Sequence, residues 1–195
     1  MTAGLPNVPP SKGADERPIL TLDFDGVICM PPFGTNFGIH RRLIDPAAEP
    51  PSARVPPRWF AGPLDRLRFA FRHPDAEARA ALTQLATMRR LVVLTGRRSS
   101  PDRWLRRHGL DHLIERIVIN EGPHGSAHYK LQQVAEIGAS EHIDDDGPTA
   151  QLIADRSTVH VYLRDWPRNR GLAYSDGVTR VDHLVALASR LAGAD

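Results

Sequence analysis

The sequence predicts an α/β protein: a three-layer, doubly wound parallel sheet of the Rossmann-like type. Two observations predict this fold. Short apolar runs alternate along the chain with amphipathic helical patterns, which is typical of strand–helix–strand units. Polar side chains also gather directly after three of the apolar runs, as expected where parallel strands end at one edge of a sheet.

The individual elements follow from local signals. Ile19 to Leu22 is a short branched apolar run after Pro18, which indicates a buried first strand. The remaining strands are expected at 91–97, 114–119, 142–144 and 158–163. The first helix is expected at 74–90, with Pro74 in its first turn, and the second runs from Pro101 to Gly109 with Ser100 as its cap. The third is expected at 126–137, where Leu131, Val134 and Ala135 face inward and Gly138 ends the helix. A fourth helix begins at Pro148, and a last one follows Asp182 as its cap.

The 195 residues suffice for one core domain with a small insertion. We expect a flexible tail at 1–18, rich in Pro and Gly, and a core domain at 19–195. A cap insertion is expected at about 29–73, where prolines exclude long helices except near Leu64 to Arg72. It is interpreted as a lid over the end of the first strand, and a plain surface excursion is the alternative. Its aromatic side chains include Phe33, Phe37, Trp59 and Phe60.

Two aspartates follow the first strand. Asp23 and Asp25 stand two residues apart, and Gly26 permits a sharp turn after them. Carboxylates do not end a buried strand without a partner, because an unpaired buried charge costs several kcal/mol. Such a pair suits a hard cation, and it also suits a nucleophile next to a proton donor.

Other polar residues end the later strands. Thr95 and Gly96 end the second strand, and Asp144 and Asp145 end the fourth. Lys130 lies in the first turns of the helix at 126–137. Because ligands bind outside the carboxyl ends of parallel strands, the fold would bring these groups together.

In this order, Asp23-Phe24-Asp25-Gly26, Leu94-Thr95-Gly96, Lys130 and Ile143-Asp144-Asp145 resemble the four signatures of the haloacid dehalogenase (HAD) superfamily. The resemblance covers about 19–163. It implies that Asp23 attacks phosphorus and forms an aspartyl-phosphate, while Asp25 protonates the leaving alcohol. It further implies that Thr95, the Gly96 amide and Lys130 hold phosphoryl oxygens. The resemblance assigns Mg²⁺ to the Asp23 carboxylate, the Asp25 backbone carbonyl and the acidic pair, with Asp145 as the first choice for direct contact and Asp144 as the second.

The expected activity is Mg²⁺-dependent hydrolysis of a small phosphate monoester. The dehalogenase branch lacks the second aspartate, so Asp25 favours phosphate chemistry. The segment from Val161 to Arg170 resembles the deoxyribonucleotidases, in which an apolar strand runs into Asp-x-Pro-x-Asn. This likeness favours a nucleoside monophosphate, whose base could stack on the cap aromatics. A polynucleotide end, a sugar phosphate and a phosphoprotein are the other candidate substrates. A phosphomutase and a non-catalytic phosphate-binding module stay open as alternatives.

Composition bears on partners and compartment. No apolar run approaches the roughly 18 residues of a membrane span, and no secretory signal is expected. Cys29 is the only cysteine, which fits a reducing cytoplasm.

Arginine pairs are scattered and the net charge is +2, so nucleic-acid binding is not indicated, though not excluded. The histidine pairs 108/112 and 124/128 lack a nearby acidic ligand, which argues against zinc. The oligomeric state does not follow from the sequence.

Overall fold

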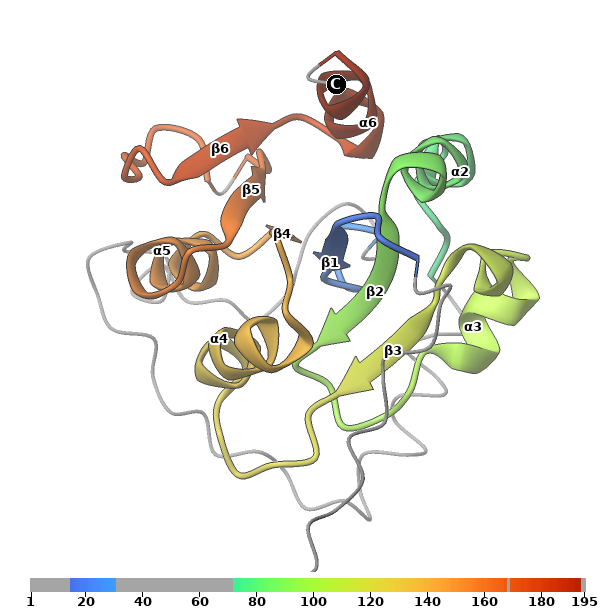
Figure 1. The fold of residues 1–195 in the computed structure, drawn as a ribbon, viewed down its shortest axis with the longest axis horizontal. Helices are drawn as coiled ribbons and strands as arrows, with labels where there is room; N and C mark the ends of the chain where they lie inside the picture. Colours follow the sequence, from blue (N-terminus) through green and yellow to red (C-terminus); the bar gives the residue numbers. More distant parts are fainter. Residues whose placement is uncertain (1–14, 31–71, 168, 194–195) are drawn as a thin grey trace, which may run out of the picture.

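The computed structural model describes residues 15–30, 72–167 and 169–193. In this part of the chain, six parallel strands form one sheet in the order β3-β2-β1-β4-β5-β6, which confirms the predicted fold (Figure 1). The strands are β1 (Ile19–Leu22), β2 (Arg90–Thr95), β3 (Arg116–Ile119), β4 (Glu141–Asp144), β5 (His160–Arg164) and β6 (Val178–Val181). The helices are α2 (Ala78–Met88), α3 (Asp102–Arg107), the 3₁₀ turn η3 (Asp111–Leu113), α4 (Ser126–Ile137), α5 (Gly147–Arg156) and α6 (Leu184–Ala192).

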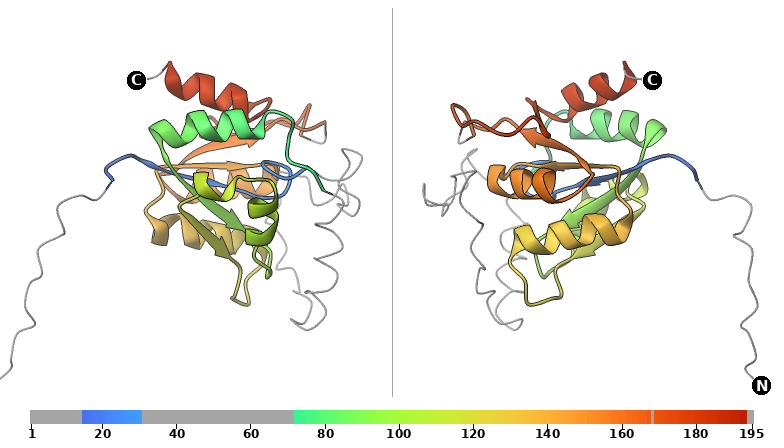
Figure 2. Two further views of the ribbon diagram at one scale, coloured as in Figure 1. Left: turned by 90° about the vertical axis from the view of Figure 1, so that its right-hand side faces the viewer. Right: turned by 60° about the vertical axis from the view of Figure 1, so that its left-hand side comes forward.

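Helices cover both faces of the sheet, so two apolar cores form (Figure 2). Side chains of α2, α3 and α6 pack on one face against β1 residues such as Leu20 and Leu22. Side chains of α4 and α5 pack on the other face, against Val161 and Leu163 of β5. The alternation along β5, where Tyr162 belongs to the first core, is the period-two pattern of a strand buried on both sides.

The chain order creates a topological switch point between β1 and β4. From β1 the chain builds outward to β2 and β3, and it then returns to the other side of β1 to add β4, β5 and β6. Ligands in open α/β sheets bind at such a point, beyond the carboxyl ends of the strands. The residues that follow β1 and β4 therefore flank the expected binding position.

Several predicted boundaries are wrong by a few residues. The helix expected from Pro74 begins at Ala78, because backbone bonds from Met30 N to His73 O (3.0 Å) and from Asp75 N to Ile28 O (3.2 Å) hold this segment extended. The helix expected from Pro101 begins at Asp102, whose amide contacts Ser100 Oγ at 3.3 Å.

The later elements also differ in detail from the predictions. Helix α4 has the predicted bounds and ends at Gly138 with φ +70°, but Ala135 is exposed and Tyr129 is buried in its place. Helix α6 is capped not by Asp182 but by His183, whose Nδ1 accepts from the Ala186 amide at 3.2 Å. Strand β6 was not expected.

Other sequence predictions lie outside the described residues. These are nearly all of the cap insertion at 29–73, with its short helix and aromatic side chains, and most of the tail at 1–18. None of the described helices is long and apolar enough to cross a membrane.

Candidate active site

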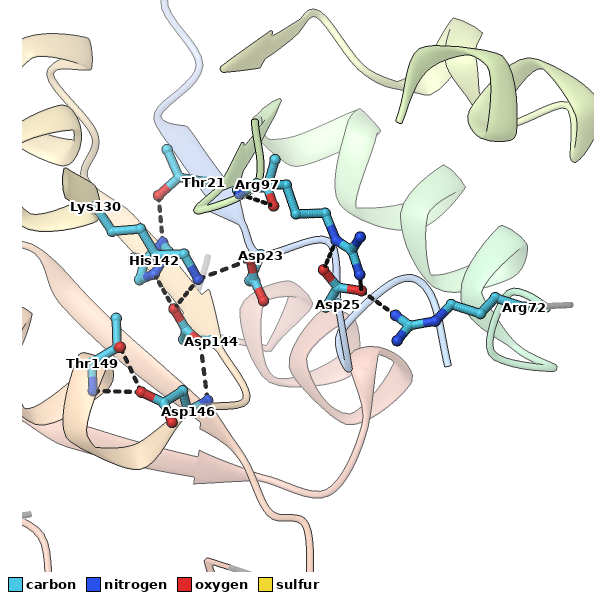
Figure 3. Close-up of polar contacts among 11 residues, drawn as sticks. Thr21, Asp23, Asp25, Arg72, Arg97, Lys130, His142, Asp144, Asp146 and Thr149 are labelled. Carbon is cyan, nitrogen blue, oxygen red and sulfur yellow. Dashed lines mark hydrogen bonds and ion pairs between the residues drawn. The ribbon is translucent and has the colours of Figure 1, made fainter. Parts of the chain in front are cut away.

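Three carboxylates meet at the switch point. Asp23 follows β1 directly, and its amide donates to the Ile143 carbonyl at 2.9 Å, which fixes it beside the end of β4. Asp144 ends β4 and Asp145 follows. One carboxylate oxygen from each of the three lies within 4.8 Å of the others, and all three residues are buried. Figure 3 shows Asp23 and Asp144 with Lys130 between them. In the described part of the chain this is the one group of three or more such side chains with metal-ligand geometry.

Lys130 joins two of these acids. Its Nζ lies 2.8 Å from Asp23 Oδ1 and 2.7 Å from Asp144 Oδ2, and its side chain is 4% exposed. Burial disfavours the ammonium, but the charges of Asp144 and Asp23 outweigh burial and raise the pKa of Lys130 above its ordinary value. Lys130 is therefore a fixed cation within the site.

The acidic group carries more negative charge than Lys130 balances. Burial, with the charges of Asp144 and Asp25 added, raises the pKa of Asp23 to about 7 despite the opposing effect of Lys130. Asp144 behaves differently: burial acts to raise its pKa, but Lys130 and His142 hold that pKa well below its usual range. A hard divalent cation with oxygen ligands would relieve the repulsion among the three carboxylates, so the residues present fit Mg²⁺.

A buried network holds Asp144 in place. Lys130 and His142 Nε2 (3.1 Å) both contact its Oδ2, and the Asp146 amide donates to its Oδ1 at 3.0 Å. His142 Nδ1 in turn lies 2.8 Å from the Thr21 hydroxyl. Burial lowers the pKa of His142, so the ring is neutral. Because the Asp144 carboxylate can only accept, Nε2 carries the proton, and Nδ1 is an acceptor that faces the Thr21 hydroxyl, which also contacts the Glu141 carbonyl at 3.1 Å.

Asp146, the third acid of the Asp144-Asp145-Asp146 run, caps the N-terminus of helix α5. Its Oδ2 accepts from the Thr149 amide at 3.1 Å and the Thr149 hydroxyl at 2.6 Å, the contacts of a helix N-cap.

The Asp25 side chain is directed toward two arginines (Figure 3). Arg97 Nη2 donates to Asp25 Oδ1 at 2.7 Å and its Nε pairs with Oδ2, while Arg72 Nη1 pairs with Oδ1. Burial favours the neutral acid, but the hydrogen bond and charge of Arg97 and the charge of Arg72 prevail and lower the pKa of Asp25. Asp25 is thus the ionised partner of two guanidinium groups.

Thr95 and Gly96 lie at the end of β2, the neighbour of β1. Thr95 is buried, and its hydroxyl accepts from the Arg97 amide at 3.3 Å. A Cβ atom at Gly96 would stand 1.9 Å from Ser126 Oγ, so only glycine lets this turn approach the start of α4 so closely. The turn that carries Thr95 is thereby packed against the helix that carries Lys130.

The last residue of β5 and the segment that follows it hold two loops of the site in place. Arg164 Nη1 and Trp166 Nε1 donate to the Gly26 carbonyl at 2.8 and 3.0 Å. Asn169, which is 1% exposed, donates through Nδ2 to the Asp145 and Arg164 carbonyls, each at 3.0 Å. The sequence motif that suggested a deoxyribonucleotidase thus has a positioning role here.

The structure therefore brings Asp23, Lys130, Asp144 and Asp145 into direct proximity, and it pairs the Asp25 side chain with Arg72 and Arg97. Sequence reasoning missed Arg72, Arg97, His142 and Thr21. Arg97 directly follows Gly96, so its place in the sequence could have indicated that it belongs to the site. Nothing in the sequence linked Arg72 or Thr21 to the site.

No protein-family model and no curated protein sequence matches the chain. Solved structures do resemble it in fold. A provisionally assigned phosphoglycolate phosphatase from Lactobacillus plantarum matches with TM-score 0.61 and 13% identity, over 90% of this chain and 99% of that one. A haloacid dehalogenase-like family hydrolase from Xanthomonas campestris matches with TM-score 0.56 and 11% identity, over 92% and 97%.

A third match is D,D-heptose 1,7-bisphosphate phosphatase from B. bronchiseptica, in complex with magnesium and phosphate. It has TM-score 0.55 and 11% identity, over 91% of this chain and 99% of that one. At these identities the matches establish that the chain shares the fold of HAD-like hydrolases.

Proposed function

We propose that the protein is a Mg²⁺-dependent phosphohydrolase that cleaves phosphate monoesters through an aspartyl-phosphate on Asp23. The observation that carries the proposal is the contact of Lys130 with Asp23 and Asp144 at the switch point, beside Asp145. A nucleophilic carboxylate, a fixed cation and a group of metal-ligating acids are the parts that phosphoryl transfer requires, because this chemistry depends on positioning and charge neutralisation.

Asp23, Asp144 and Asp145 would hold Mg²⁺ together with the Asp25 backbone carbonyl. The resemblance makes Asp145 the first choice for direct contact and Asp144 the second. In the structure, both Asp144 oxygens accept hydrogen bonds, from Lys130, His142 and the Asp146 amide. The bound ion would offset the repulsion between the Asp23 carboxylate and a phosphate dianion.

Asp25 is ionised while it pairs with the arginines, so it first takes up a proton from solvent. In the first step an Asp23 oxygen then forms a bond to phosphorus while the ester P–O bond breaks, and Asp25 gives that proton to the leaving oxygen. In the second step water attacks the aspartyl-phosphate, Asp25 takes the water proton, and phosphate leaves. Both Asp25 oxygens contact arginines in the structure, so this role requires Asp25 to exchange an arginine contact for the leaving oxygen. Thr95, the Gly96 amide and Lys130 would hold the phosphoryl oxygens.

The test is phosphate release from p-nitrophenyl phosphate and a panel of nucleoside monophosphates, with Mg²⁺ and with EDTA. Nucleoside monophosphates come first because of the Asp165-Trp166-Pro167-Arg168-Asn169 likeness. We expect release that needs Mg²⁺ and is lost in Asp23→Asn. Asp176→Asn removes an exposed acid and serves as the matched control. Acid quenching of a reaction with labelled substrate should trap phosphate on the peptide that contains Asp23.

The outcomes separate the alternatives. Trapped label without sustained release would indicate a phosphomutase. Binding of phosphate with neither label nor release would indicate a binding module. Release that survives Asp23→Asn would refute Asp23 as the nucleophile.

A further inference from the structure

Two nearly buried guanidinium groups converge on one carboxylate. The Arg72 and Arg97 side chains are 5% and 13% exposed, and both pair with Asp25. They come from different parts of the fold: Arg72 precedes α2, and Arg97 follows β2. Asp25 is therefore the shared carboxylate partner of two arginines from separate parts of the chain.

Arg72 has donor capacity that the described residues leave unused. Its Nη1 pairs with Asp25, while its Nε is buried without a hydrogen-bond partner in the described part of the chain. A buried cation with an unsatisfied N–H is costly to keep for the fold alone, and a neutral side chain would avoid that cost. An additional anion beside Arg72 would satisfy this donor.

The position of Arg72 indicates which part of a substrate it would meet. In Figure 3, Lys130 and Asp23 lie on one side of Asp25, and Arg72 approaches from the other. Under the proposed function, Asp23 faces phosphorus and Asp25 faces the leaving oxygen. Arg72 therefore lies beside the leaving alcohol rather than beside the transferred phosphoryl group.

We propose that Arg72 binds a second anionic group on the leaving alcohol. The preferred substrates are then phosphate monoesters whose alcohol also carries a carboxylate or a further phosphate. The planar fork of arginine matches both groups in bidentate fashion. Binding of that anion would also draw arginine contacts away from Asp25 and leave a carboxyl oxygen for the leaving group. This inference rests on the proposed function.

The experiment compares kcat/KM within matched substrate pairs at constant ionic strength. 3-Phosphoglycerate and glycerol 3-phosphate differ by a carboxylate, and thymidine 3′,5′-bisphosphate and thymidine 5′-monophosphate differ by a phosphate. In at least one pair we expect the wild type to favour the more anionic member roughly tenfold, the effect of one charged hydrogen bond. The pair that shows the preference distinguishes carboxylate from phosphate.

Variants then assign the preference to Arg72. Arg72→Gln should bring the ratio toward one, and Arg72→Lys should retain part of it. Arg116→Gln removes an exposed arginine at the start of β3 and should leave the ratio unchanged. If Arg72→Gln fails to fold, as judged by circular dichroism, the kcat/KM ratios of the wild type within the substrate pairs still test the inference.

A wild type without preference for the anionic member in either pair would overturn the inference, as would equal losses on both members in Arg72→Gln. p-Nitrophenyl phosphate separates this failure from that of the proposed function, because its leaving group carries no second anion. Mg²⁺-dependent release from it, without discrimination in the pairs, overturns the inference alone. No release from any substrate overturns both.

Discussion

Gly26 lies against Asp145: a Cβ atom at Gly26 would stand 1.9 Å from Asp145 Oδ2. Gly26 also has φ +77°, a conformation that side chains rarely adopt. These two facts together explain why a glycine, Gly26, follows Asp25. The turn needs a residue that can adopt this conformation and that leaves space for the Asp145 carboxylate.

We therefore expect Gly26→Ala to displace the Asp145 carboxylate and weaken Mg²⁺ binding at least tenfold, the scale of losing support for a metal ligand. Gly171→Ala is the matched control, because Gly171 has the same φ of +77° and nothing within 4 Å of the added Cβ. Each variant should lose about 1–2 kcal/mol through backbone strain. Isothermal titration with Mg²⁺ makes the comparison, and equal affinities in the two variants would refute the steric argument.

Asn169 should matter for metal binding although it contacts no ion. Asn169→Ala removes the donor to the Asp145 carbonyl and should weaken Mg²⁺ affinity, along with a stability loss of about 2 kcal/mol for two buried hydrogen bonds. Asn120→Ala is the control: Asn120 is equally buried and bonds His124 O and Gly122 N in another loop. Denaturant unfolding should show similar losses, whereas Mg²⁺ titration should separate the two.

Thr21→Val tests the network behind Asp144. The change keeps the shape of a fully buried side chain but leaves His142 Nδ1 without the hydroxyl that faces it, so we expect a loss of about 2 kcal/mol in unfolding free energy. Thr87→Val removes an exposed hydroxyl that bonds Gln84 O, and it should cost well under 1 kcal/mol. Similar losses in both variants would argue against a structured His142 contact.

Cys29 should be inert until the protein unfolds. Burial, with the charge of Asp25 added, raises the pKa of its thiol to about 12 from an ordinary value of 9.0. Because the thiolate is the reactive form, we expect no reaction with Ellman's reagent at pH 8 in buffer and one thiol per chain in denaturant. Rapid reaction of the native protein would show that Cys29 is accessible.

Stability should fall at alkaline pH. The pKa of Tyr162 is raised to about 12, chiefly by burial and then by the charge of Glu141, from an ordinary value of 10.0. The unfolded chain ionises first, at its Cys29 thiol and Tyr162 phenol, so their stabilising contribution is intact below about pH 9 and is lost as pH rises toward 12. Thermal melts should show a shallower decline above pH 10 in Tyr162→Phe than in wild type.

Local signals in the sequence were sufficient to predict the fold and to identify which strand ends carry the candidate site residues. Apolar runs that end in Asp23, Thr95 and Asp144 identified neighbouring parallel strands, because only the carboxyl edge of the sheet gathers such residues. The bounds of α4 were predicted correctly, since Gly138 adopts the left-handed conformation that ends a helix.

The contacts of Asp25 could not be read from the sequence. Its pairing with Arg72 spans 47 residues, and no periodicity or spacing reports a contact of that range. The same applies to Thr21 and His142, whose side chains meet only because β1 and β4 are adjacent in the sheet. The contribution of Asn169 was visible as a motif, but its role as a brace depended on where the Asp145 carbonyl lies.

The central place of β1 has a consequence for how the chain folds. Thr21 and the Glu141 carbonyl that it contacts are separated by 120 residues, so one side of β1 stays unpaired until β4 has been synthesised. Contacts this distant in sequence slow folding, and a newly made chain would expose an apolar strand edge for that interval. A chain that ends before β4 would keep that exposed edge and would tend to aggregate.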